Sequence, residues 1–284
     1  MADKKISFWK KAQVFAKNNG RIIIGGILIL FVLTMGILAP VLTEYDPVET
    51  NGYKTHLPAG AEGHLLGTDG LGRDIWSRLL YGARTSILLA VSVQIVTIAV
   101  GCILGLICGY YPKVDLFLMR ILEAINALPT ILLVYVLIMV MGNGYPSLVF
   151  AMVVGSMTGI ARYIRAQVMS LRQKEFVERE VVIGAGTIRT MILHVLPHCS
   201  SYLLVRFGSG LGANIMSLAT LSFLGVGMPG GAPSWGADIS AAQRTLLAYP
   251  DKVFYPMIAI AITVYGFSML ADGLRDYMSP ELRH

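Results

Sequence analysis

The sequence predicts an all-α protein that is embedded in a membrane. Of its 284 residues, 55% are hydrophobic and only 14% are charged, and the mean hydropathy is +0.65, far more apolar than a soluble domain with a polar surface. The apolar runs are long and continuous, unlike the short alternating segments of a membrane β-barrel. Because hydrocarbon offers no water to pair with backbone groups, such runs must form helices.

Six stretches are long enough to cross the membrane, since a hydrocarbon core of about 30 Å requires about 20 apolar residues. They are Ile22–Leu42, Thr85–Tyr110, Leu116–Met141, Ser147–Ile164, Tyr202–Val226 and Val253–Leu274. The first follows a basic lead, as in a secretory signal, but its apolar run continues without a clear small-x-small cleavage site, which predicts a retained helix. Pro129 predicts a kink in the third.

The distribution of lysine and arginine predicts the orientation. If the N-terminus is cytoplasmic, most of the 23 lysines and arginines fall on the cytoplasmic side, as the positive-inside rule requires. Both termini are then cytoplasmic. The net charge of +6 is explained by this topology, and because the basic residues flank spans instead of forming one patch, no nucleic-acid partner is expected.

No pattern of catalytic or metal-binding residues is found. The sequence has no GxxxxGK[ST] phosphate loop, no HExxH and no GxSxG. Cys102, Cys108 and Cys199 are too scattered for a zinc or redox site and are predicted to be packing residues. His194 and His198 are four residues apart, but Pro197 between them favours a solvated or headgroup-facing pair over a metal site. We expect no catalytic residue and no metal.

Glycines recur at a spacing of four within three spans, which predicts surfaces where helices approach closely. The helix-packing candidates are Gly101, Gly105, Gly109, Gly155, Gly159, Gly208 and Gly212. The alternative is that glycine is simply common in membrane helices.

Polar side chains deep in the spans are candidates for a translocation path. Gln94, Asn214, Ser217 and Thr220 are neutral groups that either line such a path or bond one helix to another. Three charged residues in the spans (Glu123, Arg206 and Asp272) lie near helix ends, within reach of the membrane surface, and are interpreted as snorkelling side chains.

Two outer loops are predicted to be ordered. The first, from Thr43 to Arg84, has glycine turns and a short amphipathic helix from Asp74 to Tyr81. The second follows the fifth span and is rich in glycine and proline. Trp76, Trp235 and Tyr249 are amphipathic anchors suited to a membrane interface or a docking partner.

A polar segment from Lys174 to His198, between the fourth and fifth spans, predicts a cytoplasmic docking site. Gly184-Ala185-Gly186 separates two short amphipathic helices, and Pro197 is expected to follow the end of the second. The apolar face of the second helix is predicted to contain Ile188, Met191, Ile192 and Val195.

Several motifs resemble those of one family. They are HLLGTDGLGRDIWSRLLYGARTS, the GYY-x-x-VD-x-x-LMR pattern from Gly109 to Arg120, LSFLGVG followed by PSWGADI, and DGLRDYMSPELR. Together they resemble the C-type permease subunit of peptide, opine and nickel ABC importers, over nearly the whole chain. The resemblance implies a type I ABC importer permease fold in the bacterial cytoplasmic (inner) membrane, with residues 1–83 as an N-terminal unit and residues 84–284 as a five-helix permease core.

The docking segment is similar to that family's coupling helix, which the resemblance places at about residues 171–197. Glu178 stands for the acidic residue of the family motif, Gly184 for its glycine, and Leu196 with Pro197 for its closing pair; Arg179 and Glu180 stand where the family has two alanines. The ATPase-coupling candidates are Glu178, Arg179, Glu180, Gly184, Ala185, Gly186, Leu196 and Pro197.

The partners and cofactors follow from the resemblance. It implies a second homologous permease subunit, an extracytoplasmic substrate-binding protein, surrounding membrane lipid, and two cytoplasmic ATPase subunits that hold ATP and Mg, so that this chain binds no cofactor and is not itself an enzyme. The implied cargo is short peptides, with nickel or metal chelates and opines as alternatives. A secondary transporter, for which no convincing internal repeat is found, and a membrane scaffold are the other function classes considered.

Overall fold

The structure is a computed structural model that describes residues 19–174 and 186–278. Its long helices are α2 (Gly20–Ile37), α4 (Ile75–Tyr110), α5 (Pro112–Asn126), α6 (Thr130–Met141), α7 (Tyr145–Leu171), α10 (Ser200–Phe223) and α12 (Asp251–Met278). Shorter ones are α3 (Ala39–Leu42), a 3-10 turn (Ala61–Gly63), α9 (Thr187–Thr190), a π turn (Met191–Val195), a 3-10 turn (Leu196–Cys199) and α11 (Trp235–Gln243). The described residues contain no strand beyond one isolated bridge between Thr68 and Asp74, which confirms the all-α class.

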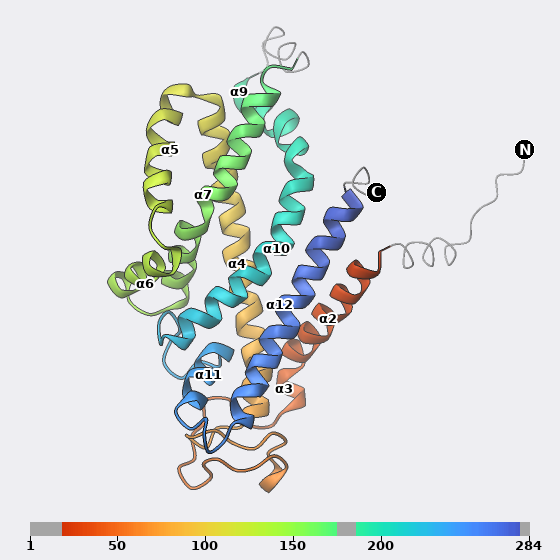
Figure 1. Ribbon diagram of the computed structural model, residues 1–284, viewed down its shortest axis with the longest axis vertical. Helices are drawn as coiled ribbons and strands as arrows, with labels where there is room; N and C mark the ends of the chain where they lie inside the picture. Colours follow the sequence, from red (N-terminus) through yellow and green to blue (C-terminus); the bar gives the residue numbers. More distant parts are fainter. Residues whose placement is uncertain (1–18, 175–185, 279–284) are drawn as a thin grey trace, which may run out of the picture.

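Helix α4 is the centre of the bundle. Its 36 residues run the length of the molecule, with α7 and α10 packed along it, and Ala90 and Val93 are fully buried where the helices meet (Figure 1). Asp74 caps its N-terminus by accepting a hydrogen bond from the Ser77 amide at 2.6 Å. The short amphipathic helix predicted from Asp74 is therefore not separate from the second span: both are one helix.

Glycines of α4 allow α7 to pack directly against it. A Cβ on Gly101, Gly105 or Gly109 would come within 2.7 Å of Ile160, 2.6 Å of the Ala161 carbonyl oxygen and 2.5 Å of Val168, respectively. These distances are far below van der Waals contact, so the two backbones can lie this close only because the glycines have no side chains.

The other glycines predicted at helix contacts differ among themselves. Gly155 faces Thr130 of α6 at 2.9 Å from a built Cβ, and Gly208 and Gly212 face α12 at 3.3 and 3.5 Å. Gly159 is exposed, and a Cβ there would meet nothing within 4 Å in the described part of the chain. Gly155 and Gly159 therefore do not form one packing surface within this chain.

The third predicted span is not one kinked helix. It consists of α5 and α6, which meet at an angle of 94°, so that α6 lies across the direction of α5 (Figure 1). Pro129 directly precedes α6 and has no backbone N–H, and it disfavours helical geometry at Leu128, so the chain breaks between Asn126 and Thr130. The sequence indicated that the chain would bend at Pro129 but not how large the bend would be.

By length and composition, four described helices could each cross a membrane: α2, α4, α7 and α12, or five crossings if α5 and α6 are counted as one broken span. Helix α10 has 24 residues but is not among them, because Arg206, Asn214 and several glycines and serines make it less apolar. The protein is thus a multi-pass membrane protein, and a sixth crossing by α10 stays a prediction.

Helices α2 and α12 pack side by side, so the start of α2 and the end of α12 lie toward the same end of the molecule (Figure 1). A Cβ on Gly25 would lie 2.7 Å from the Gly266 carbonyl oxygen, so this contact is also close. An exposed ion pair of 2.9 Å joins Arg21 to Asp276 at this end.

Candidate functional site

The predicted coupling segment is only partly described. Glu178, Arg179, Glu180, Gly184 and Ala185 lie outside the described residues, so their placement stays a prediction. The chain leaves α7 at Leu171 and is described again from Gly186, which is exposed. Both points lie at the end of the bundle that α9 marks in Figure 1.

The second half of the segment continues into α10 without a break. Backbone of helical type runs from α9 through the π turn and the 3-10 turn to Ser200. Pro197 stands near the start of its 3-10 turn, where a missing N–H is tolerated. Pro197 was predicted to follow the end of the second short helix, but helical backbone continues past it, and Leu196 and Pro197 lie inside a connection to α10.

This connection is packed firmly against the bundle. Met191, Val195 and Cys199 are buried in one apolar cluster with residues of α4 and α7, among them Cys102 and Val168. Ile192, predicted on the same face, is half exposed. The π turn explains the difference, because its wider spiral changes which side chains share a face.

Polar contacts hold the neighbouring helix ends together. Arg165 of α7 forms a two-pronged ion pair with Asp115 of α5. Arg172 donates a hydrogen bond of 3.0 Å to the Tyr110 carbonyl oxygen and lies 5.0 Å from the centre of the Tyr110 ring. Helices α4, α5 and α7 are therefore tied at the end where the coupling segment joins them.

Two of the predicted path residues bond helix to helix. Asn214 of α10 donates a 3.0 Å hydrogen bond to the side-chain oxygen of Gln94 on α4, and the Gln94 amide donates to the Arg206 carbonyl oxygen at 3.2 Å. Both side chains are buried. Gly210 provides the space, because a Cβ there would lie 2.2 Å from the Gln94 oxygen. Here Gln94 and Asn214 join α4 to α10.

Ser217 and Thr220 lie on a more open part of α10. Both are partly exposed, and the Thr220 hydroxyl donates a hydrogen bond of 2.9 Å to the Met216 carbonyl oxygen in its own helix. Thr220 borders an apolar hollow of about 410 Å³ formed by α10, α11 and α12. Of the four predicted path residues, Gln94 and Asn214 are therefore buried between α4 and α10, whereas Ser217 and Thr220 are partly exposed.

The histidines near the coupling segment are arranged along one turn, with His198 Nδ1 2.7 Å from the His194 carbonyl oxygen. Within the described residues, no group of three or more histidine, cysteine, aspartate or glutamate side chains is placed to hold a metal ion.

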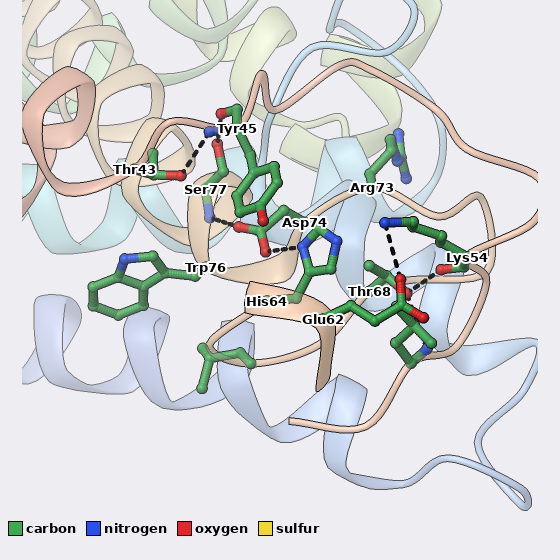
Figure 2. Close-up of polar contacts among 12 residues, drawn as sticks. Thr43, Tyr45, Lys54, Glu62, His64, Thr68, Arg73, Asp74, Trp76 and Ser77 are labelled. Carbon is green, nitrogen blue, oxygen red and sulfur yellow. Dashed lines mark hydrogen bonds and ion pairs between the residues drawn. The ribbon is translucent and has the colours of Figure 1, made fainter. Parts of the chain in front are cut away.

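The loop between α3 and α4, predicted to lie outside the membrane, is an ordered cap built on polar contacts. His64 Nδ1 lies 2.9 Å from Asp74 Oδ1 in a buried pair, and the Tyr45 ring lies 4.4 Å from the His64 ring (Figure 2). The Ser77 hydroxyl donates a 2.7 Å hydrogen bond to the Tyr45 carbonyl oxygen, and an exposed ion pair joins Lys54 to Glu62 (Figure 2). The first turn of α4 thereby fixes the loop.

Buried charges fasten the loop between α10 and α12 to the same cap. Arg78 of α4 pairs with Asp238 of α11 at 2.6 Å and donates to the Pro47 carbonyl oxygen at 2.7 Å. Lys252 at the start of α12 donates to the Leu57 carbonyl oxygen at 2.8 Å, and the His56 and Tyr249 rings stack 4.2 Å apart. Three helices and two loops that are distant in sequence thus form one unit.

Burial raises the pKa of Asp238 even though Arg78 acts to lower it. The second carboxylate oxygen of Asp238 is buried without a hydrogen-bond partner among the described residues. The sequence alone assigns no partner to Arg78 or Lys252. The only feature of the sequence that could have marked these two residues is that each lies in the first turn of a long, otherwise apolar helix.

The described residues form a multi-pass helical bundle, with loops fastened at one end of α4 and a helical connection to α10 at the other. Residues 97–284 match the family described as "Binding-protein-dependent transport system inner membrane component", and the chain belongs to that family. It is a permease subunit of a binding-protein-dependent ABC importer.

Curated relatives resemble it along its whole length. It is 34% identical over 284 residues to the oligopeptide transport system permease protein OppC of Bacillus subtilis, covering 100% of this chain and 93% of that protein. It is 34% identical over 294 residues to the dipeptide transport system permease protein DppC of Haemophilus influenzae, covering 100% of both. With the glutathione transport system permease protein GsiD of Pectobacterium atrosepticum it shares 34% identity over 277 residues, 97% of this chain and 91% of the relative.

Proposed function

We propose that this chain forms half of the translocation path of an ATP-driven importer of short peptides. The substrate class is proposed from the names of the relatives above. These names specify oligopeptides, dipeptides and glutathione, which is itself a short peptide. Each alignment spans more than nine-tenths of both chains, so the similarity concerns the whole permease rather than one shared motif.

The partners follow from the family. A second homologous permease completes the path, two cytoplasmic ATPase subunits bind ATP and Mg, and an extracytoplasmic binding protein delivers substrate to the outer cap. Catalysis takes place on the ATPase subunits, and this chain binds no cofactor. The chain crosses the bacterial inner membrane six times with both termini in the cytoplasm, and residues 1–83 precede a permease core of residues 84–284.

The coupling segment transmits the ATPase motion through α10. Support comes from the continuous helical backbone between Thr187 and Phe223, because a displacement at α9 moves the start of α10 directly. The buried cluster around Met191 and Val195 connects the same segment to α4 and α7. Glu178, Arg179, Glu180, Gly184, Ala185 and Gly186 contact the ATPase subunit in this proposal, with Leu196 and Pro197 closing the segment.

Residues of α10 change their surroundings during transport. Ser217 and Thr220, on the more open side of the helix, line the path. Gln94 and Asn214 hold α10 against α4 in the conformation described here. When the path opens, they exchange the hydrogen bond between them for bonds to water or substrate. Buried amides bonded only to each other and to backbone are well suited to such an exchange, because each bond in a membrane interior contributes only about 0.6 kcal/mol on average.

The test is transport by the complex that copurifies with this chain. A tagged chain purified from its native membranes should bring down an ATPase subunit and a second permease. After reconstitution with the binding protein, vesicles should take up labelled di- and tripeptides only with ATP, and ionophores should not stop uptake. Uptake of nickel chelates and opines is measured in the same vesicles, because these are the alternative substrates. ATP-independent uptake, or uptake of a nickel chelate but of no peptide, would contradict the proposal.

A further inference from the structure

Two hollows near the start of α4 share Trp76 as a lining residue. One is apolar, with a volume of about 250 Å³, and lies between α2, α4 and α12. The other, of about 470 Å³, lies between the end of α3, the following loop and the first turn of α4. Trp76 lines both. Figure 2 shows its indole ring pointing away from the His64–Asp74 pair, and its Nε1 donates to the Leu42 carbonyl oxygen at 3.3 Å.

The apolar hollow has almost no polar surface, although two tryptophans line it. Its walls include Phe31 and Met35 of α2, Leu80 of α4, and Ile258 and Ile262 of α12. Trp235 closes it, with its Nε1 donating to the Leu79 carbonyl oxygen at 3.1 Å. Both indole N–H groups are therefore bonded to backbone, which leaves aromatic and aliphatic carbon to face the hollow. Such a surface suits a hydrocarbon chain and offers nothing to a polar ligand.

The second hollow has the opposite character and carries negative charge. Its lining includes Thr43, Glu44 and Asp74 and contains no lysine or arginine, and the Asp74 side chain is only 2% exposed. Asp74 already accepts bonds from His64 and the Ser77 amide. The Glu44 side chain is exposed and forms no hydrogen bond or ion pair with any residue in ranges 19–174 and 186–278. A cationic group entering this hollow would therefore meet an open carboxylate.

We propose that the two hollows form one site for a phospholipid with a primary-amine head group, such as phosphatidylethanolamine. An acyl chain occupies the apolar hollow, Trp76 packs against the glycerol region, and the ammonium donates to Glu44. Tryptophan is enriched at this depth of a membrane because its ring is apolar and its N–H is polar. The two volumes together lie within the range of about 300–1,000 Å³ typical of ligand sites. A head group with a net negative charge is disfavoured, because it would face the open Glu44 carboxylate with no lysine or arginine in the lining.

The probes are phosphatidylethanolamine, phosphatidylcholine and phosphatidylglycerol, each with the same photoreactive group on one acyl chain. The purified importer complex is placed in nanodiscs with one probe at a time, and adducts are mapped by mass spectrometry. The ethanolamine probe is expected to label peptides containing Phe31–Met35 and Tyr255–Ile262 above the level found on other membrane-facing helices. Excess unlabelled phosphatidylethanolamine, but not the other two lipids, is expected to compete.

Two matched variants distinguish lipid binding at a specific site from general contact with the bilayer. Ile258→Trp fills the apolar hollow, whereas Ile103→Trp places the same change on α4 outside it; the two isoleucines are 53% and 57% exposed, so neither change disturbs a packed core. Labelling should fall to the general surface level only in Ile258→Trp. Glu44→Gln should reduce the preference for ethanolamine over glycerol head groups by about two- to fivefold, the range expected for one partly exposed ion pair.

Three outcomes would overturn the proposal. Equal labelling by all three probes would show a bulk lipid surface, and labelling that persists in Ile258→Trp would place the chain elsewhere. A cross-link from residue 258 to the second permease subunit, without lipid adducts, would show that a protein covers the groove. The proposal concerns lipid and does not depend on which cargo the importer carries, so either can fail alone.

Discussion

Replacing Gly105 by alanine should destabilise the bundle, although alanine is the better helix former. The added Cβ would lie 2.6 Å from the Ala161 carbonyl oxygen and 2.7 Å from Ile164 Cβ, about 1 Å inside ordinary contact. The oxygen belongs to the α7 backbone, so relief requires that α4 and α7 move apart. Overpacking of this kind costs about 1–3 kcal/mol, against about 0.5–1 kcal/mol gained from replacing glycine in a helix. The net loss is on the order of 1 kcal/mol.

Gly159→Ala is the matched control, because a Cβ at Gly159 meets nothing within 4 Å among the described residues. The assay is thermal unfolding of the detergent-solubilised protein followed by size-exclusion chromatography of the fraction that remains folded. The midpoint should fall for Gly105→Ala and stay level or rise for Gly159→Ala. If Gly105→Ala is as stable as the parent, the close approach of α4 and α7 is not as described, and if both variants fall equally, the effect is not one of packing.

Three further predictions concern a buried acid, a helix contact and the coupling segment. Burial raises the pKa of the Asp238 carboxyl above its usual 3.8, so the folded protein binds the carboxyl proton more tightly than the unfolded chain does. The stability that this proton contributes therefore grows as the pH falls toward 3.8 and is lost as the pH rises through the raised pKa. Asp238→Asn should flatten this part of the curve of stability against pH, and an unchanged slope would contradict the raised pKa. Asn214→Leu removes the bond to Gln94 and should lower stability by about 0.6–1.7 kcal/mol, measured by the same thermal assay with Gln94→Leu/Asn214→Leu as the paired variant. Glu178→Lys should abolish uptake and substrate-stimulated ATPase activity in reconstituted vesicles while membrane insertion stays normal, and unaltered activity would remove Glu178 from the coupling site.

The helices with the longest apolar runs were predictable because hydropathy is a local property. The helices α2, α4, α7 and α12 are each long and apolar enough to cross a membrane, and no tertiary information is needed to see this. The spacing of Gly101, Gly105 and Gly109 also identified the α4 contact surface, because residues four apart on a helix share a face. The identity of the facing helix, α7, could not be read from that spacing.

Features that depend on two distant segments were not predictable. Gln94 and Asn214 are 120 positions apart, and the sequence left open whether they line a path or bond two helices. Arg78 and Asp238 are 160 positions apart, and neither was assigned a partner. The sequence predicted a kink at Pro129 but did not indicate its angle of 94°.

The sequence by itself determined that this protein is a helical membrane permease, since composition and run length decide whether a chain can stay in hydrocarbon, and its motifs resemble one transporter family. The tertiary structure alone decided which polar groups hold the helices together, how the loops at one end are fastened to α4, and where the apolar hollow beside Trp76 lies. The physical reason is that hydropathy and helical spacing act between near neighbours, whereas buried hydrogen bonds, ion pairs and hollows are formed by residues that only the folded chain brings together.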